Sequence, residues 1–533
     1  MPKYMQKRQI IIFTFFILTC MVCIWRVVSL SASDYSRTDT STSSRTLILA
    51  ESRGKIYDTH GKLLVDRESK NVAAVKPTAS ALAELQKFLD RQTFEFVMQS
   101  ASQGYPSVVE LDTYVQADGL TVANQPVRYT DSIASHIVGY LDSAGKHGVS
   151  GIEKSFDELL SQASGTLSVS YEIDAAGRVL AGTAPKITDN DFNNPSGVVL
   201  TVDREIQQIA YNALEKSTVE SGAVVVLEAK TGAVAAMVSA PSFEQNNVAQ
   251  YLDAENSPLM NKALCAYSVG SVFKPIIAAA ALESGVDVHF ASNCEGGVEI
   301  GDTRFGCWLK SGHGATDMGG ALAGSCNVYF IELAMQLNRE YLLSLCENLG
   351  FSSVLSLCSS LTSEEGTLPT LNDLMLDGEL ANLAFGQGRL SASPLQLAAA
   401  YLALVCGGEY RYPYLIKGTV DSLGSFTASQ TRAPSKIISA DTSAFLRKLM
   451  SAAVEKGNAA KPFFTTAGGK TATAQSGIYE NTQEICRTWF AGFFPADEPE
   501  YIVVVMNENG ISGSKDCAPV FRLIADEVTL LEK

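Results

Sequence analysis

Ser271-Val272-Phe273-Lys274, followed by Pro275 and an alanine-rich apolar run to Ser284-Gly285, is the stretch that decides the fold of the second half of the chain. The apolar run predicts a buried helix that begins near Ser271, where Pro275 is still tolerated because it falls in or near the first turn. Gly285 is a natural residue to end it. Because residues three apart share a helix face, Ser271 and Lys274 should lie side by side at the helix N-terminus.

This serine and lysine, the first motif, could act as a nucleophile and its general base. A helix N-terminus carries free N–H groups and partial positive charge, which favour a developing anion. Serine attacks only after a base takes its proton, and lysine is a base only when neutral. The pKa of Lys274 must then fall from ~10.4 toward about 7, a change worth ~4 kcal/mol that burial and a second cation can supply. The spacing alone is weak evidence, since Ser52-Arg53-Gly54-Lys55 also has it.

A second motif, Ser325-Cys326-Asn327, precedes the mostly apolar run Val328–Leu333. A hydroxyl and a carboxamide two residues apart can both face a cleft from a loop. The hydroxyl can relay a proton, and the amide can hold a substrate peptide group. Taken alone, the tripeptide is more often a helix cap.

The third motif is Lys470-Thr471-Ala472-Thr473 within Gly468–Ala474, which predicts a strand at a sheet edge. Alternate residues share a face, so Lys470 and Ala472 point one way and Thr471 and Thr473 the other. Such an edge suits a substrate that ends in a carboxylate, and Lys470 would be the second cation that lowers the pKa of Lys274. A phosphate-binding loop is excluded, because its motif requires glycine where Phe464 stands.

The surrounding segments predict an antiparallel sheet covered by helices. Asp203 is a plausible N-cap, and Lys230-Thr231-Gly232 is the turn of a hairpin. The expected elements are strands at Val198–Val202, Gly222–Glu228, Ala233–Ser239, Trp489–Phe494 and Tyr501–Met506, and helices after Asp203 and over Pro519–Leu531.

The N-terminal part begins with a membrane-spanning pattern. Basic residues precede an apolar run over residues 10–28, close to the ~20 residues that cross a bilayer. They predict a cytoplasmic tail over 1–9 and a chain that continues outside the cell. A cleaved signal peptide is the alternative, since Ser29-Leu30-Ser31 offers small residues at a cleavage site. Residues 29–45, rich in Ser and Thr, predict a stalk.

Residues 46–195 mix short strands with amphipathic helices and predict a separate domain without catalytic groups. Strands are expected at Leu47–Ala50 and Val72–Val75, and helices at Ser80–Leu89 and Phe94–Ser102. Arg53–Asp58 with Gly61, and Gly148–Lys154, each predict a glycine turn that leads into a strand or helix.

Charge and cysteine spacing exclude some functions. The formal charge of −16 argues against nucleic-acid binding. The eleven cysteines form no paired CxxC motif, so we expect no metal site. In an oxidising compartment Cys294–Cys307 and Cys486–Cys517 are candidate disulfides. The five histidines are dispersed, and only His313, after Trp308, is a candidate for the rim of a cleft.

In this order the three motifs approach the set found in penicillin-binding proteins and related β-lactamases. The sequence resembles the class B penicillin-binding proteins over nearly its whole length. Phe385-Gly386-Gln387-Gly388, with Pro394-Leu395-Gln396 after it, is similar to a loop of that family, and Trp489–Phe493 is similar to the strand after the third motif. Arg53–Asp58 and Gly148–Lys154 resemble its N-terminal pedestal.

The resemblance implies a role for each residue of the first two motifs. Ser271 would be the acylated nucleophile and Lys274 its general base. Ser325 would pass the proton to the departing D-alanine, and Asn327 would orient the donor peptide. The backbone N–H groups of Ser271 and Thr473 would form the oxyanion hole.

For the third motif, the resemblance implies that Lys470, Thr471 and Thr473 bind the substrate carboxylate. Ala472 is a departure, because the family usually has glycine there. Its methyl group would either face the cleft or be turned away, and we expect altered substrate or β-lactam fit without loss of acylation.

The implied protein is an α+β chain with an N-terminal transmembrane helix, a mixed α/β pedestal (46–195) that serves in dimerisation without catalysis, and a transpeptidase domain (196–533). It would cross-link stem peptides ending in D-Ala-D-Ala, bind β-lactams, need no cofactor and work beside a glycosyltransferase. A D,D-carboxypeptidase or β-lactamase, and a non-enzymatic β-lactam sensor or scaffold, remain alternatives.

Overall fold

The computed structural model describes residues 3–32, 43–457, 459–480 and 483–531. Two compact units make up the chain. The first comprises Met1–Glu51, Lys70–Gln125 and Thr166–Phe192, and the second Ser52–Ser69, Pro126–Gly165 and Asn193–Lys533. Most of the expected stalk, residues 33–42, lies outside the described residues.

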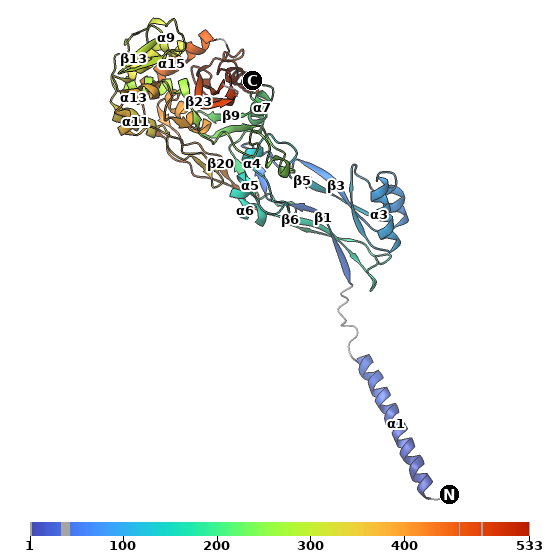
Figure 1. The fold of residues 1–533 in the computed structure, drawn as a ribbon. Helices are drawn as coiled ribbons and strands as arrows, with labels where there is room; N and C mark the ends of the chain where they lie inside the picture. The colour runs from blue at the N-terminus through green and yellow to red at the C-terminus, as the bar shows by residue number, and fades with distance from the viewer. Residues whose placement is uncertain (1–2, 33–42, 458, 481–482, 532–533) are drawn as a thin grey trace. The chain divides into compact units, whose positions relative to one another are not determined.

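Helix α1 (Lys3–Ala32) contains the predicted apolar segment (Figure 1). Its stretch Ile11–Ser29 is 19 residues long with a mean hydropathy of 2.4, and within the described residues it is the one helix long and apolar enough to cross a membrane. The prediction of a single candidate span is therefore confirmed.

The first unit stacks two small sheets and two helices. One sheet has the order β1-β6-β7 and the other β4-β3-β5. Alternate residues of β3 serve two cores: Ala73 and Val75 pack with the helices, whereas Val72 and Ala74 pack with side chains of β1 and β6. The elements are β1 (Ser44–Ser52), β3 (Glu68–Val75), α2 (Ala79–Leu85), α3 (Arg91–Ser102), β4 (Ser107–Leu111), β5 (Leu120–Val127), β6 (Gly165–Glu172) and β7 (Lys186–Asn190). The strands and α3 lie where the sequence predicts them, but α2 ends four residues before the predicted Leu89.

The second unit is built on a five-stranded sheet of order β10-β9-β25-β24-β23, antiparallel throughout. Its strands are β9 (Gly222–Glu228), β10 (Val234–Ala240), β23 (Gly468–Glu480), β24 (Gln483–Phe494) and β25 (Tyr501–Gly510). The third motif therefore lies on an edge strand, as predicted.

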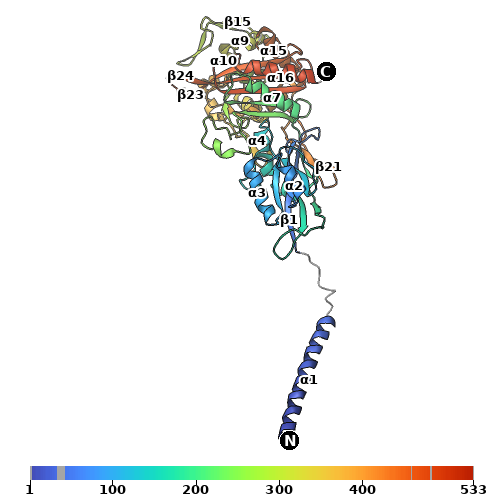
Figure 2. The same cartoon turned by 90° about the vertical axis from the view of Figure 1, so that its right-hand side faces the viewer.

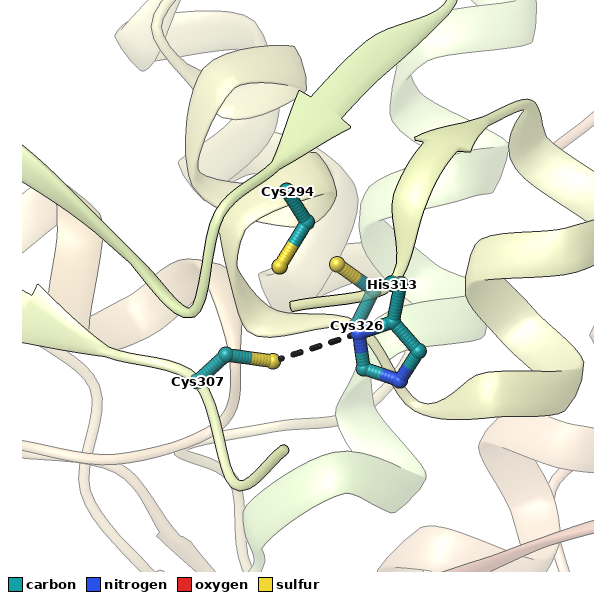
Figure 3. A group of neighbouring side chains, drawn as sticks. All are labelled: Cys294, Cys307, His313 and Cys326. Carbon is teal, nitrogen blue, oxygen red and sulfur yellow. Dashed lines mark hydrogen bonds between the residues drawn. The ribbon is translucent and has the colours of Figure 1, made fainter. Parts of the chain in front are cut away.

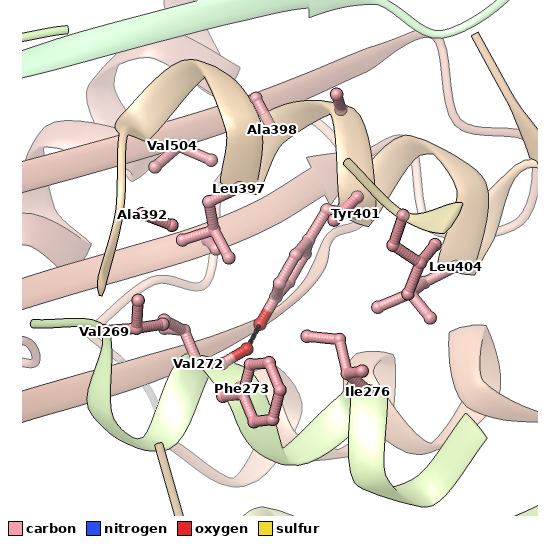
Figure 4. Close-up of a cluster of buried hydrophobic side chains, with 14 of the residues drawn as sticks. Val269, Val272, Phe273, Ile276, Ala392, Leu397, Ala398, Tyr401, Leu404 and Val504 are labelled. Carbon is pink, nitrogen blue, oxygen red and sulfur yellow. Dashed lines mark hydrogen bonds between the residues drawn. The ribbon is translucent and has the colours of Figure 1, made fainter. Parts of the chain in front are cut away.

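Helices cover both faces of this sheet. On one face lie α7 (Arg204–Glu215), which Asp203 caps, and α16 (Cys517–Leu531) (Figure 2). On the other lie α8 (Lys274–Glu283) and α14 (Pro394–Val405), where Tyr401 of α14 donates a hydrogen bond of 2.7 Å to the Val272 carbonyl (Figure 4). The strands alternate accordingly: Val503 and Val505 face the first pair of helices, and Val504 the second. The predicted sheet between helices is confirmed.

The remaining elements of this unit surround that sandwich. A mixed sheet of order β2-β8-β20-β21 joins β2 (Lys55–Tyr57), β8 (Gly197–Leu200), β20 (Ile416–Val420) and β21 (Phe426–Ala428). The helices are α4 (Ser135–Val138), α5 (Gly151–Ser155), α6 (Asp157–Gln162), α9 (Met318–Gly324), α10 (Asn327–Ala334), α11 (Arg339–Asn348), α12 (Leu371–Leu374), α13 (Asp377–Ala384) and α15 (Ala440–Gly457). Short strand pairs are β11 (Tyr267–Ser268) with β18 (Ser391–Ala392), β12 (Ser292–Cys294) with β15 (Gly314–Thr316), β13 (Gly297–Ile300) with β14 (Thr303–Gly306), β16 (Ser356–Cys358) with β17 (Leu361–Thr362), and β19 (Glu409–Tyr410) with β22 (Ser435–Lys436).

The two glycine-containing segments of the N-terminal half meet in this unit through buried charges. Arg53 Nε donates to Glu153 Oε2 at 3.0 Å, and Arg128 Nε donates to Glu153 Oε1 at 2.8 Å. Glu153 is fully buried, and a Cβ at Gly148 would come within 2.0 Å of its carbonyl oxygen. The segments are thus structural, because a buried carboxylate is stable only with such partners.

Candidate active site

All three motifs border one open cavity of about 670 Å³ in the second unit. Edge strand β23 forms one wall. Among the residues lining it are Ser271, Ser325, Asn327, Thr471, Ala472 and Thr473. The nucleophile predicted from sequence is therefore within reach of a ligand.

Ser271 lies in a 3-10 turn, η3 (Gly270–Phe273), that leads directly into α8. Gly270 holds the turn in place with a φ of +67°, and its N–H donates to the Gly386 carbonyl at 2.7 Å. A Cβ at Gly386 would lie 1.9 Å from the Gly270 oxygen, so no other residue fits there. The loop around Gly386 thus fixes the backbone that carries Ser271.

Lys274 is fully buried at the first position of α8 and reaches toward the second motif. Its Nζ lies 2.8 Å from the Ser325 carbonyl oxygen, 3.2 Å from Ser325 Oγ and 2.7 Å from Asn327 Oδ1. Burial lowers the pKa of Lys274 well below its ordinary value, and nearby Lys470 lowers it further. A neutral amine has two N–H donors and one lone pair. It can therefore donate to the two carbonyl oxygens and accept from a hydroxyl.

Lys470 supplies the second charge without lining the cavity. Its side chain is buried, and its Nζ donates to the Thr471 carbonyl at 2.9 Å. Burial lowers the pKa of Lys470 to about 7. Its neighbours Thr471 and Ala472 border the cavity but Lys470 itself does not, so Lys470 acts on Lys274 through its electrostatic field.

The third motif alternates as a strand must. Thr473 is exposed and Thr471 half-exposed, whereas Lys470 and Ala472 are buried. Ala472 is only 3% exposed, and its Cβ would lie 3.3 Å from a Cβ built on Gly270. Its methyl group is therefore turned inward, against the turn that carries the nucleophile.

Sequence reasoning missed several residues around the cavity. Trp308 and Lys310 come from the loop after β14, and Phe385 and Gln387 come from the glycine-containing loop that was noted only as a family resemblance. Nothing local in the sequence of the β14 loop signals its place at the cavity.

The cysteines were also misjudged. Cys294, Cys307, Cys486 and Cys517 are free thiols, so neither candidate disulfide is present. Contrary to the expectation that the cysteines form no metal site, Cys294, Cys307 and Cys326 gather with His313 in an arrangement that could hold a metal ion. His313 accordingly faces these thiols.

The model of the penicillin binding protein transpeptidase domain matches residues 222–526, more than half of the chain. The chain belongs to the penicillin-binding protein transpeptidase family. The predicted enzyme class, a serine-type transpeptidase, is thereby confirmed.

Relatives of this family match both halves of the chain. Stage V sporulation protein D of Bacillus subtilis is 29% identical over 505 residues, covering 87% of this chain and 75% of that protein. Peptidoglycan D,D-transpeptidase MrdA of Acinetobacter baumannii is 28% identical over 542 residues, covering 87% and 78%. The predicted resemblance to class B penicillin-binding proteins is confirmed.

Solved structures of similar proteins agree with the fold. Penicillin-binding protein 3 of Mycobacterium tuberculosis, complexed with aztreonam, has a TM-score of 0.66 at 23% identity, covering 92% of this chain and 97% of that one. The D,D-transpeptidase domain of a peptidoglycan glycosyltransferase from Eggerthella lenta has a TM-score of 0.65 at 25% identity, covering 91% and 99%.

Proposed function

We propose that this chain cross-links peptidoglycan through an acyl-enzyme on Ser271. The Ser271 hydroxyl attacks the carbonyl between the two D-alanines of a stem peptide. An ester bond to Ser271 forms, the peptide bond breaks and D-alanine leaves with a proton. The amine of a second stem peptide then attacks the ester, forms the cross-link and restores the hydroxyl.

The observation that carries this proposal is the buried amine of Lys274 between Ser325 and Asn327, one turn from Ser271. A buried, neutral amine can take the proton of Ser271. Ser325 Oγ, 3.2 Å from that amine, is suited to relay the proton to the leaving D-alanine. Asn327 keeps its amide at the cavity edge, where it can orient the donor peptide.

The substrate carboxylate would lie along β23. Thr471 and Thr473 offer donors on the cavity side, and Lys470, when protonated, adds positive charge from behind the strand. The backbone N–H groups of Ser271 and Thr473 would receive the negative charge that develops on the carbonyl oxygen. Both residues border the same cavity.

The layout of the chain extends the proposal. Residues 10–28 would anchor the protein with residues 1–9 inside the cell, 29–45 would be the stalk, 46–195 a non-catalytic pedestal and 196–533 the transpeptidase domain. The excess of basic residues before the apolar run supports this orientation. The donor glycan strands would come from a separate glycosyltransferase.

The test uses the full-length chain in detergent with a stem-peptide donor ending in D-Ala-D-Ala and a stem peptide bearing a free amine. Cross-linked dimer should form together with D-alanine, and Ser271→Ala should abolish both. Ser284→Ala, at the opposite end of α8, is the control and should retain both. Release of D-alanine without dimer, with the acceptor in excess, would instead identify a hydrolase.

A further inference from the structure

Three cysteines and one histidine converge beside the second motif (Figure 3). Cys294 ends β12, Cys307 follows β14, His313 precedes β15 and Cys326 caps α10. One ligand atom from each lies within 4.8 Å of the other three. The three thiols are buried, with exposures of 1% or less, and the four ligands come from three segments of the chain, because Cys307 and His313 share the loop between β14 and β15.

The ring of His313 is oriented by its neighbours. Its Nε2 is 3.0 Å from the Gly324 carbonyl oxygen, which can only accept, so Nε2 carries the hydrogen. Nδ1 is then left with its lone pair, and it lies 3.5 Å from Cys307 Sγ. A Cβ at Gly324 would come within 3.0 Å of the ring, so glycine leaves the room that this orientation needs. A hydrogen bond from the far ring nitrogen to a carbonyl is how proteins fix histidine ligands of metals.

The backbone is folded tightly to bring these ligands together. A Cβ at Gly296 would lie 2.1 Å from the Lys310 oxygen, and one at Gly312 would lie 2.0 Å from the Cys294 oxygen. Both glycines have positive φ, at +90° and +78°. This packing closes the segment between Cys294 and His313 on itself.

We propose that Cys294, Cys307, His313 and Cys326 bind one zinc ion. A tetrahedral site with Zn–S bonds of about 2.3 Å separates its ligand atoms by about 3.8 Å, so the cluster needs only a small contraction. Binding releases three thiol protons and forms three Zn–S bonds and one Zn–N bond, which leaves a net charge of −1. A disulfide explains this cluster less well, because a disulfide among three thiols would leave one thiol unpaired and give the histidine no role.

The zinc ion would hold the wall of the cavity. Cys326 stands between Ser325 and Asn327, and Asn327 Nδ2 donates to the carbonyl of Gly306, the residue before Cys307, at 3.2 Å. The loop between Cys307 and His313 carries Trp308, whose Nε1 donates to the Gly324 carbonyl at 2.8 Å. One ion thus ties the second motif to the loop that borders the cavity. With four protein ligands the site is closed, so its role is to position residues and not to activate water.

The test measures metal in the full-length chain purified in detergent without chelators. We expect one zinc per chain by elemental mass spectrometry. Cys294→Ala and His313→Ala should lose most of it. Cys346→Ala, which also shortens a buried cysteine but one outside the cluster, is the matched control and should keep it. Exchange with Co²⁺ should give the visible bands of a tetrahedral thiolate site in wild type and Cys346→Ala only.

A second measurement separates this proposal from the proposed function. Removing zinc with a chelator should slow penicillin acylation at least about tenfold, the effect typical of loosened support around a site, and added Zn²⁺ should restore it. Wild-type protein without metal, or with a disulfide among these cysteines after alkylation of free thiols under denaturing conditions, overturns the zinc site. Neither result bears on whether Ser271 is acylated.

Discussion

Replacing Gly270 by alanine should damage the enzyme through two separable effects. Its φ of +67° is a left-handed conformation that costs an alanine about 1–2 kcal/mol. The new Cβ would also lie 3.0 Å from the Cβ of Ala474 and 3.3 Å from that of Ala472. Overpacking of this kind costs about 1–3 kcal/mol. The expected loss of stability is therefore about 2–5 kcal/mol.

Gly285→Ala is the matched control, at the other end of α8. It has a similar φ of +75°, but nothing lies within 4 Å of its added Cβ. It should show the conformational cost alone, about 1–2 kcal/mol. The double variant Gly270→Ala/Ala474→Gly relieves the closest contact. It should therefore lose less stability than the sum of the losses in the two single variants.

Denaturant unfolding gives the stabilities, and the rate of β-lactam acylation reports the position of Ser271. Because the clash is relieved by moving the turn away from β23, Gly270→Ala should slow acylation at least about tenfold, equivalent to ~1.4 kcal/mol in the barrier. Gly285→Ala should leave the rate within about twofold. If the two variants lose equal stability and equal activity, the close packing of this turn on β23 does not matter and the reasoning is refuted.

Three further changes follow from the site. Lys470→Met should remove the pH dependence that this lysine gives to the stability of the folded chain. Burial lowers the pKa of Lys470 to about 7, so above that pH only the unfolded chain binds this proton. Wild-type stability should therefore rise relative to the variant, by up to about 4 kcal/mol between pH 7 and 10; a constant difference in urea unfolding would contradict this. Tyr401→Phe takes a buried donor from the Val272 carbonyl and should cost about 1–2 kcal/mol, and an unchanged unfolding midpoint would argue against that bond. Ala472→Gly should lower stability by about 1–2 kcal/mol through a lost buried methyl and a less constrained strand, with β-lactam acylation nearly unchanged; a large change in β-lactam preference would place the methyl in the cavity.

Local patterns predicted much of the fold because they depend on near neighbours. Asp203 caps α7 through side-chain contacts two and three residues away, and Gly285 follows the end of α8 with positive φ. The strands around Lys230–Gly232 were found from their apolar runs and turn, since a hairpin is set by its own sequence. The three motifs could be recognised individually, and their order indicated that they meet.

Tertiary contacts were beyond such reasoning. The alternation of β23 was predictable. Which face of the strand points into the protein, however, depends on packing against Gly270, which is far away in the sequence. The cluster around Cys326 was missed because its ligands come from three separate segments, without the paired spacing by which zinc sites are recognised. The wall residue Trp308 was noted only as a neighbour of His313 for the same reason.

The central claim is that the hydroxyl of Ser271 attacks with the buried amine of Lys274 as its base. Its most direct test is peptide mapping by mass spectrometry after a β-lactam reacts with the full-length chain, comparing wild type with Lys274→Arg, whose side chain stays charged. The account predicts one adduct, on Ser271 in the wild type, and no adduct at equal exposure in Lys274→Arg. An adduct on another residue, or undiminished labelling of Lys274→Arg, would contradict it.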